Sequence, residues 1–282
     1  MGIKFRLIVM NFLQYAIWGS WLISLGAYLG GGLDFTGLQI GSFFATMGVA
    51  SLFMPAVMGI IADRWIPAQK LLGICHLVSG GFLIAAASQT AYGPLYSCML
   101  LSVMFYMPTI ALSNSVAYNA LDLARLDTVK HFPPIRVWGT VGFIAAMWFV
   151  DLTHIGGVQI KLTEWQLYVS AVLSFLLAVY SFSLPGCPVD RNVKARSWVD
   201  TLGLRAFTLF KEKRMAIFFV FSMLLGAALQ ITNAFGDSYI QSFGSMPQYA
   251  DSAIVKHSVI LLSLSQMSET FCILLIPFFL RR

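Results

Sequence analysis

Long apolar runs dominate the chain, and short polar stretches separate them. A helix needs about 20 mostly apolar residues to cross the hydrocarbon core of a bilayer. Eight stretches meet this requirement, at roughly 7–31, 38–61, 71–90, 95–120, 133–152, 165–185, 215–236 and 257–280. The apolar run at 217–221 does not alternate with polar residues, as the strands of a membrane barrel would. The pattern therefore predicts an all-α polytopic membrane protein with eight transmembrane helices.

The composition supports a membrane protein and argues against water-soluble classes. Charged residues are only 11% of the 282 residues, and hydrophobic residues are 58%. A soluble domain carries about 25% charged residues, because its surface must be wetted. The net charge of +6 does not indicate a nucleic-acid binder, since the basic residues lie between apolar runs and form no face. We therefore expect a lipid bilayer as the surroundings, no nucleic-acid partner and no soluble enzyme.

The positions of lysine and arginine predict the orientation. Loops on the cytoplasmic side of a membrane carry an excess of these residues. With the N-terminus placed in the cytoplasm, only Lys161 and Lys256 of the 18 lysines and arginines lie on the opposite side. The first apolar run follows Lys4 and Arg6 and continues past Leu29 without a convincing cleavage site, so we expect it to be retained as the first helix. We expect a multi-pass inner-membrane protein with a cytoplasmic N-terminus.

One loop, at 186–214, is long and basic, and it separates six predicted helices from two more. Ser197 and Asp200 have the spacing of a capping box. A short helix at the membrane surface is predicted by the apolar residues that then share one face, Val199, Leu202, Ala206, Leu209 and Phe210.

This order of elements is the outline of the major facilitator superfamily, in which two six-helix bundles enclose a substrate cavity. We predict a six-helix bundle at 1–185, a linker at 186–214 and two helices of an incomplete second bundle at 215–282. On this outline we expect a chain that falls short of a complete transporter, and a complete protein that is monomeric.

The loop after the second span resembles the first half of the superfamily signature, with Gly59, Asp63 and Arg64 at the matching positions. A glycine there lets two helices approach closely, and a carboxylate can face the N-terminus of a neighbouring helix. The second half of the signature is absent, because 65–67 reads Trp-Ile-Pro. These residues indicate a gating loop, and the other interpretation is an ordinary cytoplasmic helix end with a positive-inside arginine.

The fifth span begins with Pro133, which suits the first turn of a helix. Arg136, Thr140 and Phe143 follow on one helical face. A cation, a hydroxyl and an aromatic ring on one stripe can hold a planar polar ring. Alternatively, Arg136 extends only to the cytoplasmic interface.

Amide side chains interrupt the seventh span, where Gln230 and Asn233 share a face. Such amides either contact a substrate or join helices. In the eighth span, Glu269 lies 13 residues after Lys256 and 12 before Arg281, which places it near the middle of the bilayer. It is the only carboxylate that the predicted spans place at depth, and Gln266 is one turn earlier. A buried charge there indicates a functional site that faces a cavity.

The remaining polar residues indicate packing more than chemistry. Asn11, Gln14 and Trp18 share a face of the first span and either line a cavity or join helices. His76, in the third span, is interpreted as a packing residue that is hydrogen-bonded and carries no proton. The histidines and the four cysteines do not have the spacing of a metal site or a redox pair, so we expect no metal.

Several strings together resemble the bacterial nucleoside permeases of the nucleoside:proton symporter family, within the major facilitator superfamily. They lie at 12–14, 18–22, 132–136, 138–140, 213–219, 229–233 and 265–270. The resemblance extends from the first helix to Phe279, and family members have twelve helices.

The resemblance implies uptake of nucleosides driven by protons, with no cofactor apart from the proton as coupling ion. By matching strings, the substrate contacts of the family correspond to Arg136, Thr140, Phe143, Gln230, Asn233, Gln266 and Glu269. Contacts from a tenth helix have no counterpart in this sequence. The alternatives are a sugar or polyol symporter of the same superfamily, or a membrane fragment that does not transport.

Overall fold

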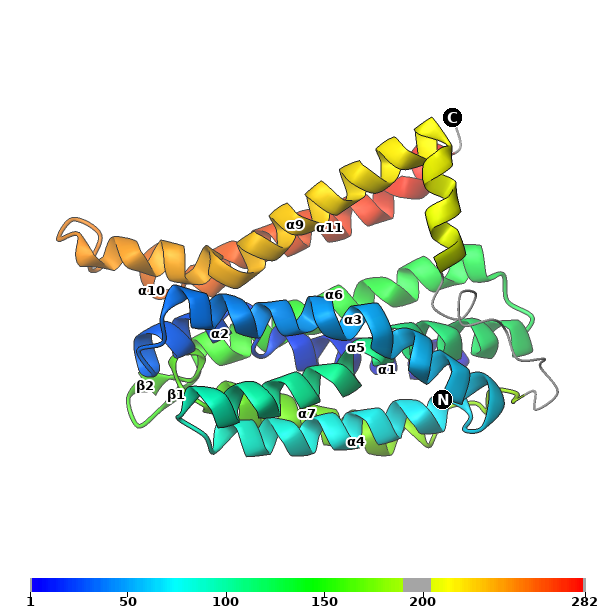
Figure 1. Ribbon diagram of the computed structural model, residues 1–282, viewed down its shortest axis with the longest axis horizontal. Helices are drawn as coiled ribbons and strands as arrows, with labels where there is room; N and C mark the ends of the chain where they lie inside the picture. The colour runs from blue at the N-terminus through cyan, green and yellow to red at the C-terminus, as the bar shows by residue number, and fades with distance from the viewer. Residues whose placement is uncertain (1, 190–203, 281–282) are drawn as a thin grey trace.

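The computed structural model describes residues 2–189 and 204–280, and its helices run roughly along one axis of the molecule (Figure 1). Among the described residues, the long α-helices are α1 (Ile3–Gly19), α3 (Gly37–Arg64), α4 (Ala68–Ala87), α5 (Tyr92–Leu123), α6 (Thr128–Leu152), α7 (Trp165–Ser181), α9 (Lys213–Ser242) and α11 (Ser258–Leu280). Each coincides with one of the predicted spans, which confirms the all-α class. Of the helices searched in the described part, five are long and apolar enough to cross a membrane.

The first predicted span is not one continuous helix. After α1 the chain makes a turn and then forms α2 (Leu25–Ala27) and a π-helix, η1 (Tyr28–Gly32). At the turn, the Ser20 hydroxyl donates to the carbonyl of Ala16 at 2.8 Å. Serine satisfies backbone groups in this way where a helix ends, so Ser20 helps to terminate α1.

Polar caps set the start of two helices. Thr36 and Gln39 form a reciprocal capping box at α3. The fifth span was expected to begin at Pro133, and this boundary is wrong, because α6 begins at Thr128. Asp127 caps it by accepting a hydrogen bond from the Val129 amide at 2.9 Å. The prolines therefore lie inside the helix.

The first six long helices pack into one bundle. α1 packs against α6 and α7, α4 packs against α5 and α7, and α3 packs against α5. The crossing of α1 and α6 is close at Gly142, where a Cβ atom would overlap the carbonyl oxygen of Phe12. Small residues allow this kind of backbone approach between membrane helices. The division of the chain at 185 and 214 stays a prediction.

Helices α9 and α11 lie on one side of this bundle and diverge from it toward one end (Figure 1). They meet it at the opposite end, which we call the hairpin end. It carries the antiparallel pair β1 (His154–Ile155) and β2 (Val158–Gln159) and the short helix α10 (Ala253–Lys256). Two 3₁₀ turns, η2 (Ile160–Leu162) and η4 (Phe243–Ser245), complete it. We call the other end, where α7 ends and α9 begins, the linker end.

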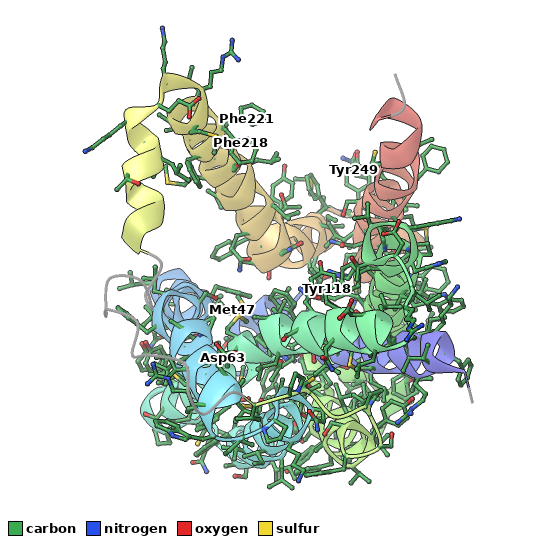
Figure 2. The ribbon with its side chains drawn as sticks, turned by 90° about the vertical axis from the view of Figure 1, so that its right-hand side faces the viewer. Met47, Asp63, Tyr118, Phe218, Phe221 and Tyr249 are labelled. Carbon is green, nitrogen blue, oxygen red and sulfur yellow. The ribbon has the colours of Figure 1, made fainter. Side chains whose placement is uncertain are left out.

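A side-chain hydrogen bond joins α11 to α6 of the bundle, within two turns of the hairpin end. The Trp148 indole donates to the Ser263 hydroxyl at 2.9 Å, and Ser263 is buried. Elsewhere α9 exposes large apolar side chains, such as Phe218 (60% exposed) and Phe221 (67%), which Figure 2 labels. Such a surface is compatible with lipid but not with water.

In the linker, the described residues form a 3₁₀ helix, η3 (Leu204–Lys211), where an amphipathic helix was predicted. Leu209 and Phe210 are partly exposed there. The predicted cap formed by Ser197 and Asp200 lies outside the described residues.

Candidate functional site

A cavity of about 180 Å³ lies between the six-helix bundle and the pair α9 and α11. Its lining comes from Tyr15, Trp18, Leu22, Arg136, Thr140, Phe143, Leu229, Gln230, Asn233 and Gln266. Six of the seven predicted substrate contacts therefore meet in one place, although they come from three helices. The seventh, Glu269, follows Gln266 in α11, and its side chain lies outside the described residues. That these residues bind a substrate stays a prediction.

The α6 side of the cavity is a mixed polar and aromatic wall. The guanidinium of Arg136 stacks on the ring of Tyr15, so the side chain lies in the cavity wall and does not extend along the helix to its end. Thr140 and Phe143 are buried one and two turns further along the same face. Trp18 meets Phe143 edge to face, with ring centres 6.5 Å apart. These rings offer flat surfaces on which another planar ring can stack.

Two hydrogen-bond donors that line this cavity, one from each wall, are buried without a partner among the described residues. They are Nε1 of Trp18 and Nε2 of Gln230. Both side chains also line an adjoining cavity of about 730 Å³, which extends between α3 and α9 past Met47 (Figure 2). Buried polar groups are almost always hydrogen-bonded, so donors left open on a cavity point to a ligand or water that they contact.

The predicted gating loop lies elsewhere. Gly59, Asp63 and Arg64 occupy the last turns of α3, at the linker end, and none of them lines the cavity. A Cβ atom at Gly59 would meet no described atom within 4 Å, so the close helix approach expected at this glycine is absent in this conformation. Asp63 is exposed (Figure 2). The gating role of these residues stays a prediction.

His76 is fully buried and hydrogen-bonded, as the sequence analysis expected. Its Nε2 atom lies 2.8 Å from Oε1 of Gln14, and its Nδ1 atom lies 3.2 Å from the Ser174 hydroxyl. The amide of Gln14 also donates to the Thr109 hydroxyl at 2.7 Å. This network joins four helices of the bundle, so Gln14 has a packing role.

Two further carboxylates, Asp237 and Asp151, are buried in the protein, and the expectation that Glu269 is the only carboxylate at depth in the bilayer stays a prediction. Asp237 lies inside α9, because this helix continues to Ser242, beyond the predicted end at 236. Asp151, in the last turn of α6, forms a buried ion pair with Lys161 at 2.6 Å. The sequence gives little sign of this pairing, because a charge near a helix end is usually solvated. Both carboxylates lie at the hairpin end.

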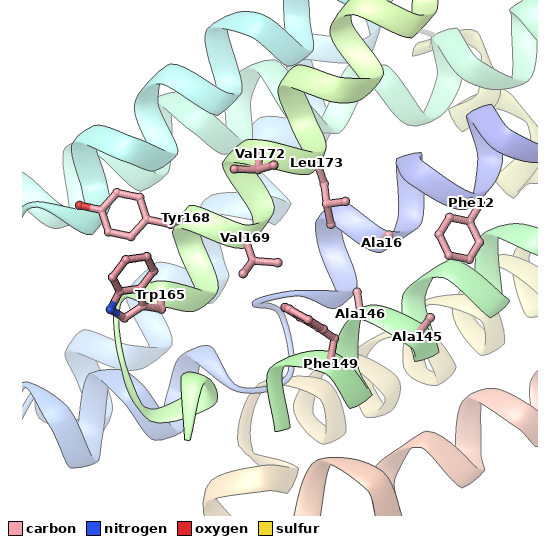
Figure 3. A pocket seen from close by; sticks show the side chains of 10 residues that line it. All are labelled: Phe12, Ala16, Ala145, Ala146, Phe149, Trp165, Tyr168, Val169, Val172 and Leu173. Carbon is pink, nitrogen blue, oxygen red and sulfur yellow. The ribbon is translucent and has the colours of Figure 1, made fainter. Parts of the chain in front are cut away.

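A third cavity, of about 460 Å³, lies between α1, α6 and α7 (Figure 3). Apolar and aromatic side chains line it, and none of the predicted site residues is among them. Ligand sites combine apolar walls with a few convergent polar groups. The cavity of about 180 Å³ that Arg136, Gln230 and Gln266 line has this combination, and we call it the candidate site.

The fold is that of an all-α polytopic membrane protein of the major facilitator type. The chain belongs to the Nucleoside H+ symporter family, which matches residues 1–282.

Curated relatives agree with this assignment. The chain is 51% identical to the xanthosine permease of Escherichia coli K12 over 282 residues, which are all of this chain and 66% of that protein. It is 47% identical to nucleoside permease NupG of the same organism, with the same coverage. It is 32% identical to the putative nucleoside transporter YegT over 280 residues, or 98% of this chain and 62% of that protein. The chain thus spans about two thirds of the length of these relatives.

Solved structures match equally well. A crystal structure of a mutant of nucleoside transporter NupG superposes with a TM-score of 0.90 at 47% identity, over the whole of this chain and 69% of the other. A second NupG structure gives a TM-score of 0.86 and covers 68% of that chain.

Proposed function

We propose that this protein takes up nucleosides across the inner membrane together with protons. Membership of the Nucleoside H+ symporter family supports this function, and so do the names of the curated relatives. The chain covers about two thirds of those relatives, so the activity is proposed for the protein expressed from its native gene. We propose transport without chemical conversion, no resident cofactor, no nucleic-acid partner and a monomeric state.

The main support for the proposal is the set of side chains that line the candidate site, the cavity of about 180 Å³. A nucleoside is neutral, with a flat base and a ribose rich in hydroxyls. The rings of Trp18 and Phe143 suit stacking on the base, and the amides of Gln230, Asn233 and Gln266 can donate to and accept from its edge. The open donors of Trp18 and Gln230 fit the carbonyl or ring-nitrogen acceptors of a base.

The proposed orientation places the linker end in the cytoplasm and the hairpin end outside. The described loops of the hairpin end carry only two basic residues, Lys161 and Lys256. An excess of lysine and arginine at the linker end supports a cytoplasmic position for that end.

Uptake of labelled uridine tests the function. The native gene is expressed in cells that lack nucleoside permeases, with and without a protonophore. We expect accumulation that collapses with the protonophore and is competed by other nucleosides but not by sugars. Competition by sugars would favour the sugar or polyol symporter, and no uptake by a correctly inserted protein would contradict transport.

A further inference from the structure

A buried cluster of charges ties the six-helix bundle to α9 and α11 at the hairpin end. Asp151 binds Lys161 through one carboxylate oxygen at 2.6 Å, and the two side chains are 0% and 1% exposed. Its other oxygen lies 2.7 Å from Nδ1 of His257, at the end of α10. Asp151 and Lys161 both belong to the bundle, through α6 and η2.

Lys161 also reaches across the interface. Its ammonium donates to the carbonyl of Lys256 at 2.8 Å and to the hydroxyl of Ser258 at 3.4 Å. Ser258 in turn donates a short hydrogen bond to Asp237 on α9. The second oxygen of Asp237 accepts from Gln241 at 2.9 Å. Both oxygens of Asp237 act as acceptors, as an ionised carboxylate requires.

The charge balance of Asp237 depends on this interface. Asp237 is fully buried, and the ammonium that reaches it through Ser258 comes from the other side of the interface. Lys256 is exposed and forms a separate pair with Asp251 at 3.0 Å. His257 and Asp151 are the other ionisable groups of the cluster, and α2, which packs on α9, brings only Leu25, Gly26 and Ala27.

The approach of α2 to α9 is close. A Cβ atom at Gly26 would lie 2.7 Å from the carbonyl oxygen of Ala234 on α9. The hairpin end is therefore tightly closed beside Asp237, and a buried carboxylate in such a place is unfavourable unless a positive charge is near.

Asp237 is also connected to the candidate site. Gln230, Asn233 and Asp237 are spaced by three and four residues, so they lie on one face of α9. Asp237 follows Asn233 by one turn, or about 6 Å along the helix. The proposed substrate contacts and the buried carboxylate therefore lie on the same face of one helix, one turn apart.

We propose that Asp237 binds the proton that is transported with the substrate, and that Lys161 displaces this proton when the hairpin end closes. This inference rests on the proposed function. When the hairpin end is open, Lys161 stays with Asp151, and Asp237 holds a proton as a neutral acid. Closure brings the ammonium to Ser258, whose hydroxyl then donates to Asp237. The O–H bond of the acid breaks, and the proton passes to water on the cavity side.

The experiment uses the protein from its native gene, reconstituted in liposomes with an imposed pH gradient. Two quantities are measured: uphill accumulation of uridine, and exchange of uridine at equal pH. We expect Asp237→Asn to lose accumulation and keep exchange at the rate of the unaltered protein. Asp251→Asn, a nearby exposed carboxylate at the same end, is the matched control and should retain both.

A second variant changes the two charged residues that the six-helix bundle contributes to the cluster, Asp151 and Lys161. Asp151→Asn combined with Lys161→Gln removes the ion pair as a unit, so neither of these two charges is left buried without the other. We expect the same loss of accumulation with retained exchange, since nothing then displaces the proton. Asp237→Glu keeps the carboxylate and should restore accumulation at least in part.

Accumulation by Asp237→Asn at the level of the unaltered protein would overturn the inference. A loss of exchange in a folded Asp237→Asn variant that still binds uridine would also overturn the inference. Asp237 would then be needed for closure of the hairpin end and not for proton binding. If Asp237→Asn does not fold, normal accumulation by the double variant overturns the inference. A different result, neither uphill accumulation nor exchange of uridine by the unaltered protein, would defeat the proposed function itself.

Discussion

The guanidinium carbon of Arg136 lies 3.8 Å from the centre of the Tyr15 ring. At this distance the planar cation stacks on the aromatic face, an interaction that strengthens when water is excluded. The stacking fixes Arg136 in the cavity wall and joins α6 to α1. It argues against the interpretation in which Arg136 only extends to the interface, while contact of Arg136 with a substrate stays a prediction.

Replacing Arg136 by lysine should weaken nucleoside binding. Lysine keeps the charge but loses the planar group that stacks on Tyr15 and the fork of donors. We expect a loss of about 1–2 kcal/mol in the binding free energy of uridine, measured by calorimetry. Arg125→Lys, at an exposed loop position, is the control and should bind normally. Equal affinities in the two variants would contradict a role for Arg136 in the site.

Glu269→Gln tests the site residue whose side chain is not described. The change keeps the size and one acceptor oxygen but removes the charge. If Glu269 accepts hydrogen bonds from ribose hydroxyls, uridine binding should weaken by about 1.5–3 kcal/mol, the usual contribution of a hydrogen bond to a charged group. We expect this result, together with retained proton coupling. Ser268→Ala, an exposed neighbour, is the control. Intact binding with lost accumulation would instead make Glu269 the proton carrier.

His76→Leu should lower stability without affecting coupling. The substitution removes the hydrogen-bond partner of the side-chain oxygen of Gln14, Oε1, inside the bundle. An unsatisfied buried acceptor costs about 1–3 kcal/mol, which thermal unfolding in detergent would detect. Leu77→Ala, at the neighbouring exposed position, should have a smaller effect. A loss of uphill accumulation in folded His76→Leu would show that the histidine takes part in proton transfer.

Gly142→Ala should disturb the crossing of α1 and α6. The new methyl group would overlap the Phe12 carbonyl, and backbone cannot move aside cheaply. We expect a loss of about 1–3 kcal/mol in stability, the usual cost of overpacking, measured as a lower Tm. At Gly81 a Cβ atom meets no described atom within 4 Å, so Gly81→Ala is the matched control and should be tolerated. Identical Tm values would argue against this crossing.

Membrane orientation can be tested with single cysteines in a background without the four native ones. Val158, in the hairpin, and Trp65, after α3, are both exposed and lie at opposite ends of the molecule. A membrane-impermeant maleimide should label Val158→Cys in intact spheroplasts and Trp65→Cys only after lysis. Labelling of both from the same side would contradict the proposed topology.

Hydropathy was sufficient to predict the eight long helices, because the thickness of the bilayer sets the length of an apolar span. Helix ends were less predictable, as α6 and α9 show, since polar caps and tertiary contacts extend a helix beyond its apolar core. The faces of Arg136 and Gln230 were predictable from helical periodicity alone.

Two kinds of site residue could not be predicted from the sequence. Tyr15, in α1, and Leu22, in the turn that follows it, belong to an apolar run of the sequence, where such residues usually pack against lipid or the core. The cluster at the hairpin end depends on partners distant in the chain: Asp151 and His257 are 106 residues apart. Only the packing of α6, η2, α9 and α10 brings these charges together, and no spacing rule indicates it.

The candidate cavity has one wall on the six-helix bundle, with Trp18 and Arg136, and the other on α9 and α11, with Gln230 and Gln266. Whatever occupies it must be small enough for both walls to close on it. A nucleoside analogue with a bulky group on the base could satisfy every polar contact and still act as a wedge. Such a compound would bind well and stall the cycle, which makes ligand size, more than affinity, the property that separates an inhibitor from cargo.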